Sequence, residues 1–246
     1  MDEKKILKIK EAIKRNFEQS PSQYETFERK YGFFSSLNGE LINTLKTHGN
    51  VRVLDIGCGT GASSRQILNA IPECQVLGLD NSPAMLEIAI NDNPDPPRLK
   101  FVEGDASELE KCVKESLDIV IYSASIFLIP DYKTSLTQAW RLLDPGGKLG
   151  LTYMIGVFEN GGGNAFICAD EHAQTNVSQK KPVEYDSLKL FVEGLFSKAD
   201  VIVRDFVCDV HMLKDFFSIP AMSAGLYPSL AYEERLKMLE TLFSHL

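Results

Sequence analysis

The sequence predicts an α/β protein built on a doubly wound, mostly parallel sheet, with helices before the sheet and a helical cap after it. Strand and helix patterns alternate from residue 51 to residue 153, which is typical of a parallel sheet with helices on both faces. A buried strand runs directly into a glycine-rich turn at Gly57. Helical patterns also occupy both ends of the chain, and these would surround the sheet.

The first 49 residues predict helices. A helix is expected over residues 3–17, because apolar residues recur at helical spacing along one face: Ile6, Ile9, Ile13 and Phe17. The run Ser-Pro-Ser at residues 20–22 breaks it. A second helical stretch is expected over residues 24–46, with a weak point at Tyr31-Gly32, and His48-Gly49-Asn50 ends it.

The alternating region supplies the sheet. Its expected strands are residues 51–55, 75–79, 99–102, 117–122 and 148–153. The expected helices are residues 62–70, a helix that begins at Ser82-Pro83, and residues 131–143. Ligands of such sheets bind outside the carboxyl ends of the strands. Those ends are Asp55, Asp80, Gly104-Asp105 and Tyr122-Ser123.

The pattern after residue 155 is less regular. We expect a loop with one short helix over residues 164–182 and a helix over residues 185–196. A long strand is expected over residues 199–210, because apolar and β-branched residues are frequent there. Two helices then follow, over residues 212–217 and 228–246. The apolar residues 216–222 either line a substrate pocket or belong to the core.

The composition limits the partners. The 246 residues carry a net charge of −8, and an acidic chain repels phosphate backbones, so nucleic acid is not expected. No apolar run approaches the roughly 20 residues that span a bilayer, so no membrane segment is expected. The five cysteines are far apart and include no Cys-x-x-Cys pair. Their spacing argues against a zinc site or a disulfide framework and favours free thiols in the cytoplasm.

The turn after the first strand indicates a nucleotide-cofactor site. Residues 51–62 read Val-Arg-Val-Leu-Asp-Ile-Gly-Cys-Gly-Thr-Gly-Ala. Glycines let a ligand approach the backbone, and the first N–H groups of the next helix lack helical partners. These glycines fit both NAD and S-adenosylmethionine. Asp55 favours the second, because a carboxylate near the pyrophosphate of NAD is unfavourable but attracts the cationic end of S-adenosylmethionine.

Several segments resemble the class I S-adenosylmethionine-dependent methyltransferases. Residues 53–61, Val-Leu-Asp-Ile-Gly-Cys-Gly-Thr-Gly, resemble motif I of that family at all nine positions. Residues 78–82, 104–106, 118–123 and 142–149 resemble its later motifs in the same order. The likeness covers about residues 50–155. It implies a Rossmann-like methyltransferase fold that binds S-adenosylmethionine, similar to the ubiquinone and malonyl-carrier-protein methyltransferases.

The resemblance also implies site residues. Asp80 would accept hydrogen bonds from the ribose hydroxyls. Asp105 would accept one from the adenine amino group, next to the Ala106 N–H, and Met85 would pack on the adenine face. Asp80 and Asp105 could instead cap local turns, and Met85 could belong to the core. The predicted cofactor-binding set is Tyr24, Asp55, Gly57, Cys58, Gly59, Gly61, Asp80, Asn81, Met85, Gly104, Asp105, Ala106, Tyr122 and Ser123.

Two further residues complete the predicted site. The spacing Phe17-x-x-Ser20-x-x-x-Tyr24 resembles the lid of the same methyltransferases, so Tyr24 would close over the cofactor or else pack between helices. A general base is needed only if the acceptor must lose a proton. His172 is the preferred candidate base, and the alternative is a solvated or structural histidine. The other candidates are Tyr153, Glu159, Asp131 and His211. No metal ligand set is expected.

The sequence therefore predicts a single domain of residues 1–246, with a lid (1–49), a cofactor-binding core (50–155) and a substrate-side cap (156–246). The predicted activity is methyl transfer from S-adenosylmethionine to a small molecule by in-line displacement. A nicotinamide-dependent oxidoreductase and a non-catalytic module that binds S-adenosylmethionine are the alternatives. The family's sheet usually ends in an antiparallel hairpin, whereas only one late strand is predicted here. No oligomeric state is predicted.

Overall fold

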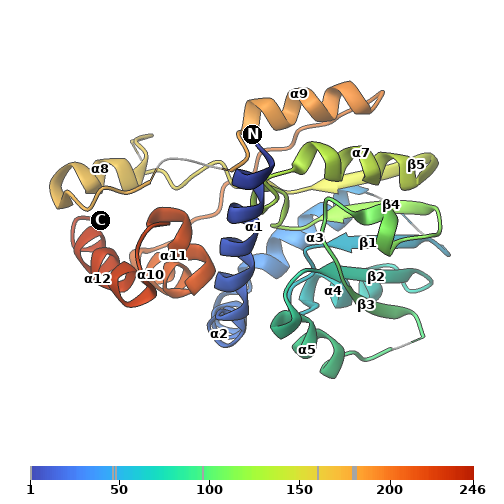
Figure 1. Cartoon of the computed structure of the whole chain (residues 1–246), viewed down its shortest axis with the longest axis horizontal. Coiled ribbons are helices and arrows are strands. Elements are labelled where there is room, and N and C mark those ends of the chain that lie inside the picture. Colours follow the sequence, from blue (N-terminus) through green and yellow to red (C-terminus); the bar gives the residue numbers. More distant parts are fainter. Residues whose placement is uncertain (1, 46, 48, 96, 160, 179–181) are drawn as a thin grey trace.

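A five-stranded parallel sheet lies at the centre of the computed structural model (Figure 1), which describes residues 2–45, 47, 49–95, 97–159, 161–178 and 182–246. The strand order is β3-β2-β1-β4-β5. The strands are β1 (Arg52–Ile56), β2 (Gln75–Asp80), β3 (Leu99–Glu103), β4 (Leu117–Tyr122) and β5 (Leu143–Leu151). The doubly wound α/β fold predicted from the sequence is confirmed.

Apolar side chains on both faces explain why these strands form a buried sheet. Leu54 and Ile56 of β1 face one apolar cluster, and Val53 faces another. Helices that pack on the first cluster are α6 (Leu109–Cys112), α7 (Tyr132–Leu142) and α9 (Tyr185–Leu195). Helices on the second are α3 (Phe33–Leu45) and α4 (Ala62–Ala70). A parallel strand covered on both sides in this way is mostly apolar, as residues 53–56 of β1 are apart from Asp55.

A helical lobe lies beyond the carboxyl ends of the strands. It consists of α8 (Ala165–Ala173), α10 (Val210–Ser218), α11 (Pro220–Leu226) and α12 (Tyr232–Phe243). Two N-terminal helices, α1 (Glu3–Glu18) and α2 (Pro21–Tyr31), stand between this lobe and the sheet (Figure 1). Phe27 of α2 packs into the lobe's core against Phe216. In the part of the chain described here, no helix is long and apolar enough to cross a membrane.

The predicted helix boundaries are close to those found. The second predicted stretch is two helices, α2 and α3, separated at Gly32, whose φ of +59° and N–H bond to the Glu28 carbonyl end α2. Helix α3 ends at Leu45, and the predicted end at residues 46–48 falls partly outside the described residues. Helix α5 (Pro83–Asn91) begins as predicted, because the Ser82 side chain accepts a hydrogen bond from the Met85 N–H.

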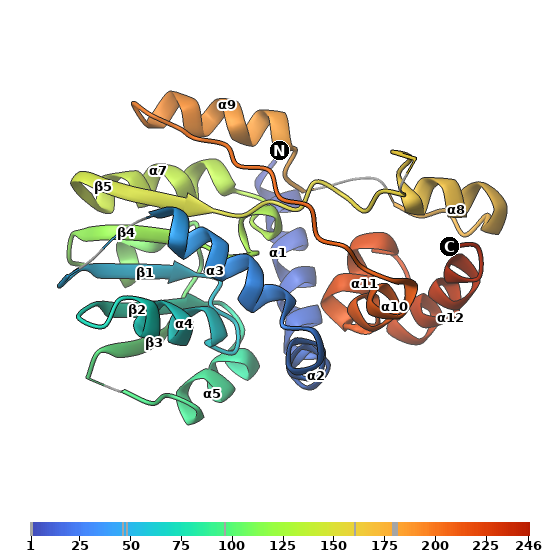
Figure 2. The ribbon, with the colours of Figure 1, turned by 180° about the vertical axis from the view of Figure 1, so that it is seen from behind.

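The predicted strand over residues 199–210 is wrong. Residues 199–209 are described and belong to no helix or strand. This segment runs past β5 between α9 and α10 (Figure 2) without pairing with β5. Val201 and Val203 are 53% and 63% exposed, and Val207 is fully exposed. The local β propensity is real, but a strand needs a neighbour to accept its backbone hydrogen bonds, and none of the described segments provides one.

Candidate functional site

A cavity with about 700 Å³ of empty space, part of it open to solvent, lies where the carboxyl ends of the strands meet the helices. We call the side formed by the turns after β1–β4 the floor: Gly57, Gly59, Leu79, Asp80, Asn81, Met85, Gly104, Ala106, Ser123, Ala124 and Ser125. We call the side formed by helices α1, α2, α3 and α11 the roof: Ile13, Phe17, Tyr24, Phe34 and Met222. Leu128 and Ile129 complete the lining.

The glycine turn after β1 is held by the neighbouring strand. The N–H groups of Gly57 and Cys58 both donate to the carbonyl of Leu79. A Cβ at Gly57 would lie 2.5 Å from the Cβ of Ser125, and the φ of Gly57 is +74°. Gly59 also has a positive φ, +55°, but a Cβ there would meet nothing within 4 Å. Gly57 is therefore required for packing, whereas Gly59 leaves its space open on the cavity side.

Asp80 joins the ends of β1 and β2. Its carboxylate accepts hydrogen bonds from the N–H groups of Gly59 and Ser82, each 2.9 Å long. Burial raises the pKa of Asp80, and these backbone hydrogen bonds oppose that rise. Asp80 lines the cavity together with Asn81 and Met85. Each of its oxygens has a further lone pair, so the carboxylate can still accept hydrogen bonds from a ligand.

Asp55 lies beneath the glycine turn and does not line the cavity. Its Oδ2 accepts hydrogen bonds of 2.6 Å from the hydroxyls of Ser63 and Ser64, at the start of α4. Its Oδ1 is buried without a hydrogen-bond partner in the described chain, as is the hydroxyl of Thr60. Burial raises the pKa of Asp55 from 3.8 to about 6, although the two serines lower it. A buried, unpaired carboxylate oxygen is stabilised by a nearby positive charge.

A second, smaller cavity of about 350 Å³ adjoins the first. The two share Tyr24, Phe34, Gly57, Ser123 and Ala124. Cys58 and Thr60 line the second cavity only. Burial raises the pKa of the Cys58 thiol well above its usual value, so this thiol stays protonated and is a poor nucleophile.

Asp105 does not line the cavity in this structure, unlike its neighbours Gly104 and Ala106. Its Oδ2 accepts a hydrogen bond of 2.8 Å from the Lys10 ammonium, and its Oδ1 accepts from the Ser107 N–H and hydroxyl. Burial tends to raise the pKa of Asp105, but the bonds from Lys10 and Ser107 hold it below its usual value. In this structure the Asp105 side chain anchors helix α1 through Lys10, and its contact with adenine stays a prediction.

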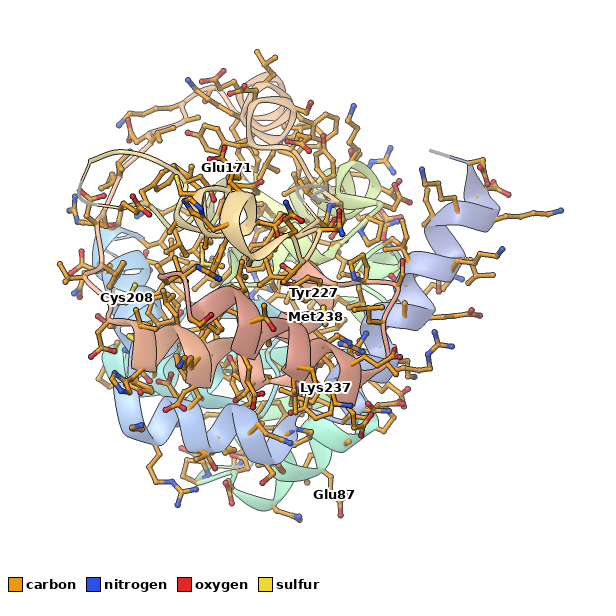
Figure 3. The ribbon with its side chains drawn as sticks, turned by 90° about the vertical axis from the view of Figure 1, so that its left-hand side faces the viewer. Glu87, Glu171, Cys208, Tyr227, Lys237 and Met238 are labelled. Carbon is orange, nitrogen blue, oxygen red and sulfur yellow. The ribbon has the colours of Figure 1, made fainter. Side chains whose placement is uncertain are left out.

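Three other predicted site residues lie away from the cavity. Tyr122 is fully buried, and its hydroxyl is 2.8 Å from that of Ser135 on α7. Gly61 caps the N-terminus of α4 with a φ of +80°. His172 is exposed on α8. Its neighbour Glu171 lies on the face of the lobe that is turned toward the viewer in Figure 3. The imidazole of His172 stacks on that of His245, at 6.1 Å between ring centroids, so the structure does not bring it to the cavity.

Several lining residues were not predicted as site residues. Ile13 and Phe17 belong to the apolar face of α1, but no residue of α1 is fully buried. An amphipathic helix whose apolar face covers a cavity instead of a core looks the same in sequence. Phe34 and Ile129 carry no sequence signal that separates them from core residues. Met222 comes from the apolar run that the sequence assigned either to a pocket or to the core.

Comparisons with known proteins bear on this cavity. The profile of the family described as a methyltransferase domain matches residues 53–147, the segment that supplies the floor. A trans-aconitate 2-methyltransferase of Deinococcus radiodurans is 34% identical over 130 residues, which are 53% of this chain and 47% of that protein. Residues 53–147 therefore carry a methyltransferase domain, similar to that of the class I S-adenosylmethionine-dependent methyltransferases. The methyl donor of that class, S-adenosylmethionine, is the cofactor of this domain.

Two further proteins are similar to parts of this chain. A malonyl-[acyl-carrier protein] O-methyltransferase of Ilyobacter polytropus is 28% identical over 140 residues, 57% of this chain and 51% of that protein. The YcgJ protein of Bacillus subtilis has a solved structure with a TM-score of 0.49 and 18% identity, covering 65% of this chain and 68% of that one. The chain spans about half the length of the curated relatives it matches.

The residues present fit S-adenosylmethionine in charge and shape. Gly59 leaves open space at the turn, and the unpaired Oδ1 of Asp55 lies buried behind it. A cationic ligand would be attracted to that oxygen. Asp80 offers free lone pairs on the same floor. No group of three or more metal-ligating side chains is found among the described residues.

Proposed function

We propose that this methyltransferase transfers a methyl group from S-adenosylmethionine to a small-molecule acceptor by in-line displacement. The observation that carries the proposal is a single cavity with two unlike sides. The floor has the Asp80 carboxylate beside an open glycine turn, and the roof is apolar. We further propose that residues 1–49 act as a lid, 50–155 as the cofactor-binding core and 156–246 as the substrate-side cap of one domain.

Each part of the floor has a proposed task. Asp80 would accept hydrogen bonds from the ribose hydroxyls, while still receiving the N–H groups of Gly59 and Ser82. Met85 and Ala106, which line the same cavity, would contact the adenine ring. Gly59 and Asp55 would receive the cationic amino-acid end. Tyr24 would close over the cofactor from the roof, where its ring stacks on Phe34 at 4.7 Å.

The chemistry asks little of the protein beyond orientation and a dry pocket. When bound, S-adenosylmethionine supplies an electrophilic methyl group: the acceptor's lone pair forms the new bond to carbon, and the carbon–sulfur bonding pair stays on sulfur. An acceptor that carries a hydrogen on the attacking atom then releases its proton to water. Apolar roof side chains such as Phe17 exclude water from the reacting atoms. Holding donor and acceptor in line is the main source of rate.

Calorimetric titration and a transfer assay test this proposal together. S-adenosylhomocysteine is expected to bind the purified protein at one site per chain, and NAD is expected not to bind. Methyl-labelled S-adenosylmethionine is then offered with a library of small molecules. Binding of NAD without S-adenosylhomocysteine would favour an oxidoreductase. Binding of S-adenosylhomocysteine with no transfer to any compound would favour a non-catalytic binding module.

We also propose a cytoplasmic protein that acts without nucleic acid. The support is the net charge of −8 and the five cysteines, all of them free thiols. Reduced thiols are typical of the cytoplasm, and an acidic chain repels nucleic acid. In a gel-shift assay at low salt, the protein is expected to leave the mobility of DNA and RNA unchanged, and a shift would contradict this proposal.

A further inference from the structure

The roof of the cavity is almost free of polar atoms. Its side chains are Ile13, Phe17, Tyr24, Phe34 and Met222, and only the Tyr24 hydroxyl carries a side-chain hydrogen-bonding group. Leu128 and Ile129 extend the apolar lining beside the loop after β4. An acceptor that sits against this side exchanges water for carbon and sulfur contacts, which stabilises an apolar body and penalises a charged one.

No cation lines the cavity. Among the described residues, neither the main cavity nor the smaller one has a lysine, arginine or histidine in its lining. Two lysines of α1 are engaged by carboxylates outside the cavity lining, Lys10 by Asp105 at 2.8 Å and Lys14 by Glu103 at 3.2 Å. A carboxylate or phosphate on the acceptor would therefore enter without a partner, at the cost of leaving its hydration.

The buried arginine near the roof is also engaged. Arg235 of α12 is only 7% exposed. Its guanidinium donates to the carbonyls of Pro220 and Leu230 and to the side chain of Asn16. These bonds tie α12 to α11 and to α1, so this cation serves the packing of the lobe and does not reach the cavity lining.

Carboxylates surround the Tyr24 side of the cavity. Burial raises the pKa of the Tyr24 hydroxyl, and four carboxylates add to the rise: Glu28, Glu25, Asp80 and Asp55. A field that opposes the phenolate of Tyr24 opposes any other anion at the same place. The same field suits a cationic methyl donor.

We propose that the methyl acceptor of this site is a neutral, largely apolar molecule, and that a carboxylate- or phosphate-bearing acceptor is excluded. This inference rests on the proposed function, since it names the acceptor class of the same cavity. It assigns acceptor specificity to the roof, which the floor motifs shared with other methyltransferases do not determine.

A matched pair of fluorescent dyes tests the proposal. N-phenylnaphthylamine is neutral, and anilinonaphthalene sulfonate has the same skeleton with one anionic group. Both are titrated into protein saturated with S-adenosylhomocysteine. The neutral dye is expected to bind at least about ten-fold more tightly, which corresponds to about 1.4 kcal/mol. Equal or tighter binding of the sulfonate would overturn the proposal.

A lysine introduced into the roof tests whether the roof determines the preference for the neutral dye. Met222 is half-buried, so Met222→Lys is expected to fold and to reduce the preference for the neutral dye by about ten-fold or more. Met222→Gln, which is polar but uncharged, is expected to leave the sulfonate excluded. Met238→Lys is the matched control, because Met238 on α12 (Figure 3) is half-buried against the lobe's core like Met222 but does not line the cavity.

The outcomes separate the two proposals. If the wild-type protein does not bind S-adenosylhomocysteine, the proposed function is contradicted. Retained S-adenosylhomocysteine binding with no change of dye preference in Met222→Lys would contradict only the acceptor class. The same shift in Met238→Lys would show that the dyes bind elsewhere, and it would also count against the proposal.

Discussion

The floor and the roof of the cavity differ in how their residues are spaced along the chain. The floor comes from residues 57–125, in turns that follow consecutive parallel strands, and its polar groups are fixed by backbone hydrogen bonds. The roof combines residues 13–34 with Met222, so it exists only after distant helices have packed together. The comparison teaches that turns at strand ends can form one side of a site locally, whereas the opposite side, to which we assign the choice of acceptor, needs helices that are far apart in the sequence.

The largest expected effect concerns the rigidity of the floor. Gly57→Ala should destabilise the fold by about 4 kcal/mol, because a Cβ at a positive φ would also collide with Ser125. Gly146→Ala is the matched control. Its φ is +84° but its space is open, so only about 1 kcal/mol is expected. Urea unfolding measures both, and equal losses would show that the contact with Ser125 is unimportant.

Next in size is the pH dependence caused by Asp55. Its pKa rises from 3.8 in the unfolded chain to about 6 in the folded protein, so the folded state binds the proton more tightly. Its contribution to stability is therefore greatest below pH 3.8 and falls by about 3 kcal/mol as pH rises past 6. Unfolding curves of the wild type and Asp55→Asn between pH 4 and 7 should diverge by this amount.

The same titration has a consequence for the cofactor. Ionised Asp55 attracts a cationic ligand, so affinity for S-adenosylmethionine should rise as pH passes upward through about 6. Asp55→Asn should flatten that rise. If the wild-type affinity for S-adenosylmethionine is constant over this pH range, the charge of Asp55 does not contribute to binding.

A smaller effect is expected for the Asp80 carboxylate, which lines the floor. Asp80→Ala should weaken S-adenosylhomocysteine binding by about 2 kcal/mol, roughly thirty-fold, because ribose donors lose their acceptor. Glu87→Ala is the control, since Glu87 is an exposed carboxylate on α5 that does not line the cavity (Figure 3). Calorimetry at one pH compares the variants, and an unchanged affinity for Asp80→Ala would remove Asp80 from the site.

The smallest effect concerns the attachment of the roof. Lys10→Met keeps the apolar stem but removes the ion pair with Asp105, so cofactor affinity should fall by about 0.5 kcal/mol, roughly two-fold. Its affinity should also depend less on salt than that of the wild type. Lys111→Met removes a more exposed ion pair with Glu108, away from α1, and should change neither quantity. Identical salt dependence in all three proteins would contradict the role of Lys10.

The sequence predicted the floor better than the roof for a physical reason. The glycine turn and Asp80 are local features at strand ends, where a parallel sheet brings its turns together. Tyr122 and Asp105 were also placed at strand ends, but Ser135 and Lys10, from other elements, fix their side chains away from the cavity. These hydrogen bonds join elements that are distant in the sequence, so local sequence patterns do not predict them.

The same distinction explains the late segment. Residues 199–209 have the composition of a strand but no described partner, so the backbone stays extended and unpaired. Helices α9 and α12 were predicted within a few residues of their bounds, because their own hydrogen bonds need no partner segment. Phe34 and Ile13 could not be told from core residues, since a cavity wall and a core have the same apolar composition.

A crystal structure of the complex with S-adenosylhomocysteine tests the central claim most directly. The account predicts that both ribose hydroxyls lie within hydrogen-bond distance of the Asp80 carboxylate, with the sulfur atom facing the roof side chains Phe17, Tyr24 and Met222. A ligand held elsewhere, or one whose sulfur faces away from the roof, would contradict the division of the cavity into a donor floor and an acceptor roof.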